Sequence, residues 1–174
     1  QEQVLIDLTE HIAGSYDLAI LFVSPWQPYD SQEIYKAIQK KIKVRHFLSC
    51  TCAGIIGSKR EIEGRPAASL FLARLPEVTV APFYINQVEL EGLQTTEALY
   101  NFFDVYPNEN PSFLILPDPY AIDTNRFLKS LNGAYNGSAI VGGLLSGAGG
   151  PGENVLIMNG EVYSEGLMGV VLSG

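Results

Sequence analysis

The sequence is poor in the residues that build metal sites and is short of positive charge. It contains two cysteines and two histidines among 174 residues, and none of them forms a cluster with the spacing of metal ligands. Lysine and arginine number 11 against 19 acidic residues, for a net charge of −8. Because phosphate binding needs a basic surface, a nucleic-acid partner is excluded. We expect no metal and no other cofactor.

Long hydrophobic runs are also absent. No apolar stretch approaches the roughly 18 residues that a membrane-spanning helix needs, so we expect no membrane partner. Cys50 and Cys52 stand two residues apart, which in an extended strand is too close for a sensible disulfide. Two free thiols indicate a reducing, cytoplasmic location.

Glycine, in contrast, is concentrated in one segment. Residues 138–152 read SAIVGGLLSGAGGPG and begin with an apolar run at 139–141 that suits a buried strand. Glycine is entropically costly, so this density indicates a tight turn or a close approach by a ligand or another backbone. Residues 147–152 fit the spacing G-x-G-x-x-G, but Pro151 and a predicted strand follow where a dinucleotide site needs a helix.

Apolar runs and capping residues predict alternating strands and helices. The expected strands are residues 17–23, 45–51, 67–73, 78–85, 112–116, 139–141, 155–158 and 167–172. The expected helices are residues 4–12, a helix starting at Asp30 with Ile34, Ile38 and Ile42 buried, a helix from Thr95 or Thr96 to Phe103, and a helix starting at Asp123 and ended by Asn132-Gly133 and Asn136-Gly137. We expect a linker at residues 90–94 and a hairpin turn at Asn159-Gly160.

The two halves of the chain match in order and spacing. Residues 21–25 resemble residues 115–119, which lie 94 positions later, and residues 47–54 align with residues 140–147 at 93 positions. Two further pairs of segments, 61–62 with 161–162 and 70–72 with 170–172, align at 100 positions. We infer a single domain, residues 1–174, made of two internal repeats at about 17–85 and 112–174.

The fold expected from these repeats is α/β, with mixed β-sheet and flanking helices. Two related strand-helix-strand-strand halves would be arranged about a pseudo-twofold axis. They would form either an α-β-β-α sandwich or a single mixed sheet with helices on both faces.

A cysteine nucleophile is the catalytic possibility that the sequence offers. Cys50 ends a predicted strand, and His46 lies four residues before it. Four residues of extended strand span roughly 13 Å, so these two side chains cannot pair directly. His11 would have to come from elsewhere in the fold. Burial as a small apolar residue is the simpler explanation of Cys50, and we expect no catalytic residue.

Four motifs, in order, resemble the FIST N-terminal domain. They are residues 48–54 (LSCTCAG), 116–119 (LPDP), 141–147 (VGGLLSG) and 166–174, and the resemblance runs from about Asp17 to Gly174. Members of this family occur in prokaryotic signalling proteins and in an F-box protein of ubiquitin ligases. The family usually has Gly-Cys where this chain has Ser49-Cys50, and a hydroxyl residue where it has Cys52.

The resemblance implies a sensory module of a signal-transduction protein that binds a small metabolite such as an amino acid. Its partners would be that ligand and a FIST C-terminal domain or another signalling protein. We expect the C-terminal domain to be absent from this chain, because Gly174 falls where the family's first domain ends. In this hypothesis the backbone amides of residues 142–150 hold a carboxylate or a similar anion.

The predicted ligand-binding residues gather in the small-residue turns and one proline loop. They are Cys50, Thr51, Cys52, Gly54, Asp118, Tyr120, Gly142, Gly143, Ser146 and Gly147. Two alternatives stay open: a protein–protein interaction scaffold, in which the glycines let strands pack closely, and an enzyme that uses Cys50 as its nucleophile. A pocket against the backbone of residues 142–150 would favour the sensor.

Overall fold

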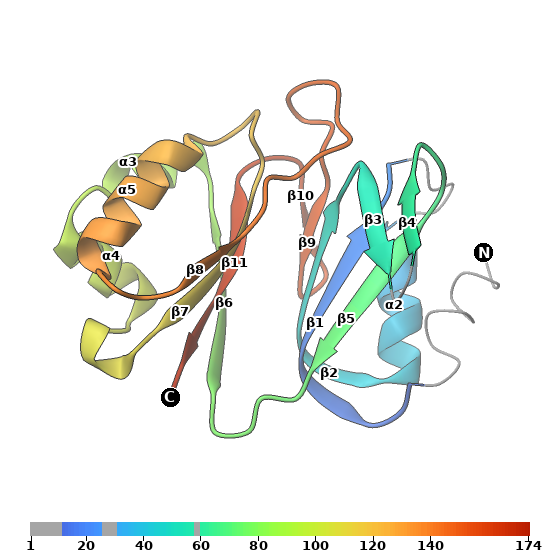
Figure 1. Cartoon of the computed structure of the whole chain (residues 1–174), viewed down its shortest axis with the longest axis horizontal. Helices are drawn as coiled ribbons and strands as arrows, with labels where there is room; N and C mark the ends of the chain where they lie inside the picture. The colour runs from blue at the N-terminus through green and yellow to red at the C-terminus, as the bar shows by residue number, and fades with distance from the viewer. Residues whose placement is uncertain (1–11, 26–30, 58–59) are drawn as a thin grey trace. The chain divides into compact units, whose positions relative to one another are not determined.

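The chain is an α/β protein built on mixed sheets with flanking helices, as the sequence predicts (Figure 1). The computed structural model describes residues 12–25, 31–57 and 60–174. The helix predicted at residues 4–12 and the cap predicted at Asp30 lie outside these ranges. The chain divides into two compact units: the first consists of Gln1–Leu75 and Leu145–Ser164, and the second of Pro76–Leu144 and Glu165–Gly174.

The first unit contains a five-stranded sheet in the order β10-β9-β2-β1-β5. Strands β1 and β2 are parallel, whereas β5 and β9 run antiparallel to β1 and β2 respectively, and β10 runs antiparallel to β9. The bounds are Ser15–Val23 (β1), Lys43–Thr51 (β2), Ala68–Ala73 (β5), Leu156–Met158 (β9), Glu161–Tyr163 (β10) and Ser31–Lys41 (the helix α2).

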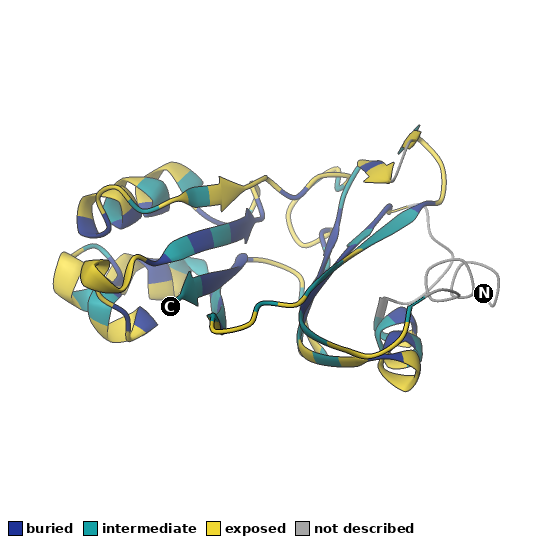
Figure 2. Cartoon of the chain, turned by 60° about the horizontal axis from the view of Figure 1, so that its bottom comes forward, coloured by how far each residue is buried: buried dark blue, intermediate teal, exposed yellow. Residues whose placement is uncertain are grey.

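Helix α2 packs on one face of this sheet through residues spaced four apart. Ile34 and Ile38 lie within the helix and Ile42 follows its end, and all three are buried (Figure 2). They share one apolar cluster with Leu21 of β1 and Phe47 of β2. The predicted isoleucine stripe is thus confirmed, and the spacing explains it because residues i and i+4 lie on the same side of a helix.

A second hairpin in the first unit was not predicted. Strands β3 (Gly54–Gly57) and β4 (Arg60–Glu63) pair antiparallel as a two-stranded sheet of their own. Of their described residues only Ile55 is buried, while Ile56 is 77% exposed. These short strands therefore lack the apolar alternation from which a strand is predicted.

The second unit contains a four-stranded sheet in the order β6-β11-β7-β8. Strands β7 and β8 are parallel, and β11 runs antiparallel to both β6 and β7. The bounds are Thr79–Ile85 (β6), Ser112–Pro117 (β7), Ile140–Gly142 (β8), Leu167–Ser173 (β11), Gln87–Gly92 (α3), Thr96–Phe103 (α4), Thr124–Ala134 (α5) and Pro107–Glu109 (a 3-10 turn).

Aromatic side chains form the centre of the second unit's core. The ring of Tyr135 lies 4.8 Å from Phe113 and 6.1 Å from Phe103, centroid to centroid. Its hydroxyl donates a 3.0 Å hydrogen bond to the Val105 carbonyl, so the polar end of a fully buried tyrosine is satisfied. Burial raises the pKa of Tyr135 well above its ordinary value. The packing fixes α4 and α5 against β7.

Three local predictions were wrong. The expected linker at residues 90–94 overlaps the short helix α3, which starts with a reciprocal capping box between Asn86 and Glu89. Helix α5 continues through Asn132-Gly133 to Ala134. The run at 139–141 forms the edge strand β8 rather than a buried strand, and Val141 is 59% exposed. The cap of α3 is local and was not predicted, whereas the end of α5 and the exposure of β8 depend on the segments packed beside them.

The strand registers can be compared at the offsets of the internal repeat that we propose. In the first unit Ala19 pairs with Phe47, and in the second Phe113 pairs with Ile140. These two pairs are related by the offsets of 94 and 93 residues that the sequence motifs suggested. In each unit the first strand of the repeat has one parallel neighbour and one antiparallel neighbour.

Candidate functional site

A pocket of about 240 Å³ lies in the second unit, where β7 and β8 end and α5 begins. The carboxyl ends of parallel strands commonly form ligand sites, because the chain leaves the sheet there and opens a crevice. Its lining residues come from three separate segments: Ile115, Pro117, Thr124, Leu128, Ile140, Val141, Gly142, Gly143 and Leu144.

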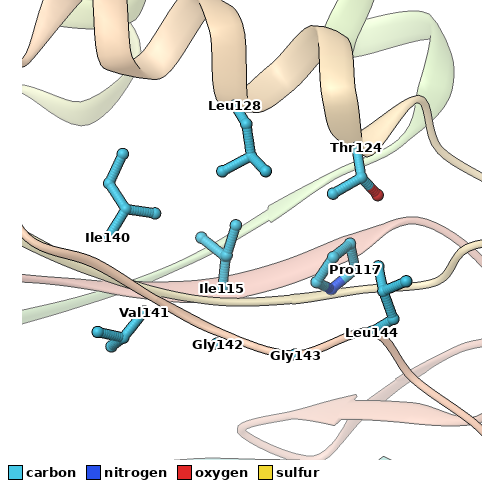
Figure 3. A pocket seen from close by; sticks show the side chains of 9 residues that line it. All are labelled: Ile115, Pro117, Thr124, Leu128, Ile140, Val141, Gly142, Gly143 and Leu144. Atoms are coloured by element: carbon cyan, nitrogen blue, oxygen red, sulfur yellow. The ribbon is translucent and has the colours of Figure 1, made fainter.

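The pocket is mainly apolar and has one helix wall and one sheet wall. Figure 3 shows Leu128 and Thr124 projecting from α5 towards Ile115 and Pro117 of β7. Val141 lies on β8 and points away from the helix, in keeping with the alternation of side chains along a strand. Leu144, which also lines the pocket, is 55% exposed.

The hydroxyl of Thr124 is the side-chain polar group of this lining. Its Oγ1 atom is buried and has no hydrogen-bond partner among the described residues. Thr124 opens α5, directly after the N-cap Asp123, whose carboxylate accepts a 3.0 Å hydrogen bond from the Arg126 amide. A buried hydroxyl without a partner costs free energy, so a ligand group that bonded to it would recover that cost.

Two neighbouring glycines of the lining have different surroundings. A β-carbon on Gly142 would lie 1.9 Å from the carbonyl oxygen of Ile115, so only glycine fits against β7 there. A β-carbon on Gly143 would meet nothing within 4 Å. The Gly143 amide donates a 3.3 Å hydrogen bond to Ile115, which ties this backbone to β7. Strand packing therefore explains Gly142, whereas Gly143 borders open space.

Two more of the predicted residues lie in the second unit, next to this pocket in sequence but outside its lining. Asp118 is fully buried, and its carboxylate accepts a 3.0 Å hydrogen bond from the Tyr120 amide. The Asp118 amide donates to the Gly166 carbonyl at 2.8 Å, which joins the loop after β7 to the start of β11. Tyr120 is 47% exposed. In the structure Asp118 organises the loop that follows Pro117.

The other six predicted residues lie in the first unit, where the two small-residue turns contact each other. The Ser146 hydroxyl accepts a 2.9 Å hydrogen bond from the Ala53 amide, and the Ser146 amide donates to the Thr51 carbonyl at 3.4 Å. A β-carbon on Gly147 would lie 2.8 Å from the Pro25 ring. The contacts of Ser146 and Gly147 thus hold residues 51–53 in position within the first unit.

Thr51 and Gly54 also have partners within the first unit. Thr51 is buried; its hydroxyl donates to the Asn154 side chain at 2.9 Å and accepts from the Val155 amide at 3.2 Å. Gly54 begins β3, with the Glu63 side chain 3.4 Å from where its β-carbon would be. These contacts hold the end of β2 to the chain that enters β9.

The two cysteines form a close pair of free thiols. Their sulfur atoms lie 3.8 Å apart. The hydrogen bond to Cys52, with burial, raises the pKa of Cys50 well above its ordinary value. The same hydrogen bond lowers the pKa of Cys52. A buried thiol that holds its proton is a poor nucleophile, which argues against an enzyme based on Cys50.

Sequence reasoning found the glycine side of the pocket and missed its helix side. It singled out Gly142 and Gly143 but not Ile115, Thr124 or Leu128. The sequence does contain an indication for Thr124. It directly follows the predicted cap Asp123, at the start of a helix that comes soon after a proline-containing loop. For Leu128 the sequence predicts only a place on the apolar face of its helix.

The described residues contain neither a metal-binding cluster nor a membrane-spanning helix. No group of three or more histidine, cysteine or carboxylate residues among them could hold a metal ion. None of the helices in the described ranges is both long enough and apolar enough to span a bilayer.

The sequence of the chain matches a known domain family. The model of the FIST N domain matches residues 17–174, so this chain belongs to the FIST N domain family, a class associated with signal transduction. No solved structure matches the chain.

Among curated proteins, the chain is similar to Uncharacterized protein Rv0628c of Mycobacterium tuberculosis (strain ATCC 25618 / H37Rv). The two are 28% identical over 165 residues, which is 95% of this chain and 42% of the relative. It is also 27% identical over 167 residues to Uncharacterized protein Mb0898c of Mycobacterium bovis (strain ATCC BAA-935 / AF2122/97), again 95% of this chain and 42% of the relative. The chain thus spans less than half the length of these relatives.

Proposed function

We propose that this chain is the ligand-binding domain of a signal-transduction protein and that it binds a small metabolite in the pocket between α5 and the ends of β7 and β8. The observation that carries the proposal is the position of the pocket. It opens against Gly142, Gly143 and Leu144, in the glycine-rich segment that also carries the family resemblance.

The size of the pocket selects the size of the ligand. Sites for drug-sized ligands occupy about 300–1,000 Å³, and this pocket is smaller, at about 240 Å³. That space equals about eight water molecules at roughly 30 Å³ each. It suits a metabolite with the dimensions of an amino acid.

The chemistry of the lining selects the kind of ligand. Ile115, Leu128 and Ile140 would surround an aliphatic group. The Thr124 hydroxyl would bond to one polar group of the ligand. An aliphatic amino acid or a similar branched metabolite fits best, and the domain would meet it in the cytoplasm.

A thermal-shift screen of aliphatic amino acids and related metabolites tests the proposal. A ligand present at about 100 times its Kd stabilises the folded state by about 2.7 kcal/mol. For a chain of this size that corresponds to a rise in Tm of roughly 5–10 °C. The proposal would be contradicted if none of the screened amino acids and metabolites raised Tm.

Two variants locate the binding. Leu128→Trp fills the pocket and is expected to abolish the shift. Thr124→Val removes the hydroxyl at nearly constant volume; it should weaken binding about tenfold, in line with the loss of one hydrogen bond, while leaving the Tm of the free protein unchanged or higher. An equal ligand shift in wild type and both variants would place the ligand elsewhere.

One observation favours the alternative of an interaction scaffold. Gly142 and Gly147 both contact other parts of their own unit where a β-carbon would be, so close packing explains these two glycines without a ligand. In addition, Val141 and Leu144 are both more than half exposed. A partner protein that covers these two side chains would support this second function.

A further inference from the structure

Cys50 and Cys52 are the two cysteines of the chain, and they lie together at the end of β2. Alternation along an extended strand places residues i and i+2 on the same face. Their sulfur atoms are accordingly 3.8 Å apart, within hydrogen-bond range for thiols.

The two thiols are not equivalent. Cys50 lies inside β2 and is 2% exposed, whereas Cys52 lies just beyond the last residue of the strand and is partly exposed. The pair shares one hydrogen bond, which raises the pKa of Cys50 and lowers the pKa of Cys52. The structure thus places a partly exposed cysteine with a lowered pKa, Cys52, beside a buried cysteine with a raised pKa, Cys50.

We propose that Cys50 and Cys52 form an oxidisable dithiol, in which Cys52 reacts with a hydroperoxide and Cys50 resolves the product to a disulfide. Redox-sensing cysteines are typically accessible, acidic and placed next to a resolving cysteine. Cys52 has the first two properties and Cys50 supplies the third. This modification site lies in the first unit and does not depend on ligand binding in the second.

The chemistry balances in two steps. The Cys52 thiolate attacks one oxygen of hydrogen peroxide, the O–O bond breaks, and the sulfenic acid Cys52–SOH and hydroxide form. The Cys50 thiol is a poor nucleophile towards a free reagent, but it lies beside the Cys52 sulfur. It attacks that sulfur as it gives its proton to the departing hydroxyl, so the S–O bond breaks and water leaves. Overall, two thiols are oxidised by two electrons and one peroxide is reduced to two waters.

An extended strand disfavours a disulfide between residues two apart, so bond formation between Cys50 and Cys52 needs a local movement away from that conformation. Two residues of extended chain span about 6.6–6.8 Å between α-carbons, at the upper end of the range for disulfides. The sulfur atoms must close from 3.8 Å to about 2.05 Å. Because Cys52 lies beyond the strand, its backbone can move more readily than that of Cys50. The resulting bridge is strained, and strained bridges are the labile, regulatory ones.

The bridge would disturb a contact that the first unit uses. The Cys52 amide donates to the Val23 carbonyl at 2.9 Å, and the next amide, of Ala53, donates to the Ser146 hydroxyl at 2.9 Å. A shift at Cys52 therefore pulls on the connection between the end of β2 and the segment that leads into β9. Oxidation is expected to speed hydrogen exchange at the Ala53 amide.

The test treats the reduced chain, Cys50→Ser and Cys52→Ser with stoichiometric hydrogen peroxide and follows intact mass. Wild type should lose both free thiols and the mass of two hydrogens while it stays a monomer. Cys50→Ser should accumulate a sulfenate at Cys52 that dimedone traps. Cys52→Ser should react at least about tenfold more slowly, as expected for a buried, protonated thiol. Far-UV circular dichroism checks that each variant is folded.

A second readout uses alkylation and does not require a disulfide. Iodoacetamide should label Cys52 about tenfold faster than Cys50 at neutral pH. Cys50→Ala removes the hydrogen-bond partner, so the pH at which Cys52 labelling is half-maximal should rise.

Four outcomes of the peroxide experiment would overturn the proposal. The two serine variants could react at equal rates, or dimedone could be trapped on Cys50 instead of Cys52. Wild type could keep both thiols, or it could be bridged only between two chains. In the alkylation experiment, Cys50→Ala should raise the pH at which Cys52 labelling is half-maximal. An unchanged or a lower pH would also count against the proposal.

Discussion

Gly142 and Gly143 are adjacent in sequence, yet the structure requires glycine only at the first of the two positions. Gly142 has a φ of +152° and packs directly on Ile115 of β7. Gly143 has open space where a β-carbon would be, and that space borders the pocket. One of them is therefore a packing residue and the other is available to a ligand.

This distinction gives a prediction about stability. Gly142→Ala would push a methyl group into the Ile115 carbonyl and should lower the free energy of unfolding by at least about 2 kcal/mol. Gly143→Ala is the matched control and should change it by less than about 0.5 kcal/mol, as a surface substitution does. Urea unfolding of both variants measures the difference. Equal losses would contradict the packing argument.

His46 gives a prediction about pH. Burial, together with the positive charge of Arg45, lowers the pKa of His46 below its ordinary value, and Asp17 offsets part of this shift. Between the lowered pKa and the ordinary value near 6.5, the unfolded chain binds more protons than the folded one. The contribution of His46 to the free energy of unfolding is therefore fully present above pH 6.5. It is lost as the pH falls from that value through the lowered pKa of the folded state.

The substitution His46→Gln removes the titrating group and should make stability less dependent on pH below 6.5. Urea midpoints of wild type and variant at several pH values between about 5 and 7.5 provide the measurement, since this window brackets the ordinary histidine pKa. Parallel curves for the two proteins would show that His46 makes no such contribution.

At the scale of elements, α5 decides the shape of the pocket because its first two turns supply Thr124 and Leu128. The start of the helix is set by the Asp123 cap. Helix α4 begins in the same manner, with the Thr95 hydroxyl accepting a 3.2 Å hydrogen bond from the Ala98 amide, but it contributes nothing to the pocket lining.

These two caps form a matched pair for testing. Asp123→Ala and Thr95→Ala should each cost about 1 kcal/mol of stability, the usual value for a lost N-cap. Only Asp123→Ala should also weaken binding of the proposed ligand, because it loosens the first turn of α5, which carries Thr124. Thermal unfolding and ligand titration of both variants would decide this. An equal loss of ligand affinity in both variants would show that the start of α5 has no specific role in binding.

The elements that could be predicted from sequence are those with a local cause. The isoleucine spacing of α2, the caps at Thr95 and Asp123, and the turn at Asn159-Gly160 each follow from neighbouring residues. The exposure of β8 could not be predicted, because it depends on which strand lies beside it. The pocket could not be predicted either, since its lining joins three segments that meet only in the folded unit.

At the scale of the whole molecule, the compact units do not coincide with the sequence repeats. Strand β6 lies at the end of the first repeat but pairs with β11 of the second unit, and β9 lies within the second repeat but pairs with β2 of the first unit. The matching registers of β1–β2 and β7–β8 nevertheless support a duplicated origin, which we propose for the chain. Duplication followed by exchange of the connecting strands explains both observations.

The central claim is that the second unit binds a small metabolite between α5 and the strand ends. The most direct measurement is the methyl NMR spectrum of isoleucine-labelled protein, recorded with increasing amounts of a metabolite that raises Tm. The account predicts concentration-dependent shifts at Ile115 and Ile140, and unchanged signals at Ile20 and Ile38 of the first unit. Shifts at Ile20 or Ile38 with none at Ile115 and Ile140 would contradict it.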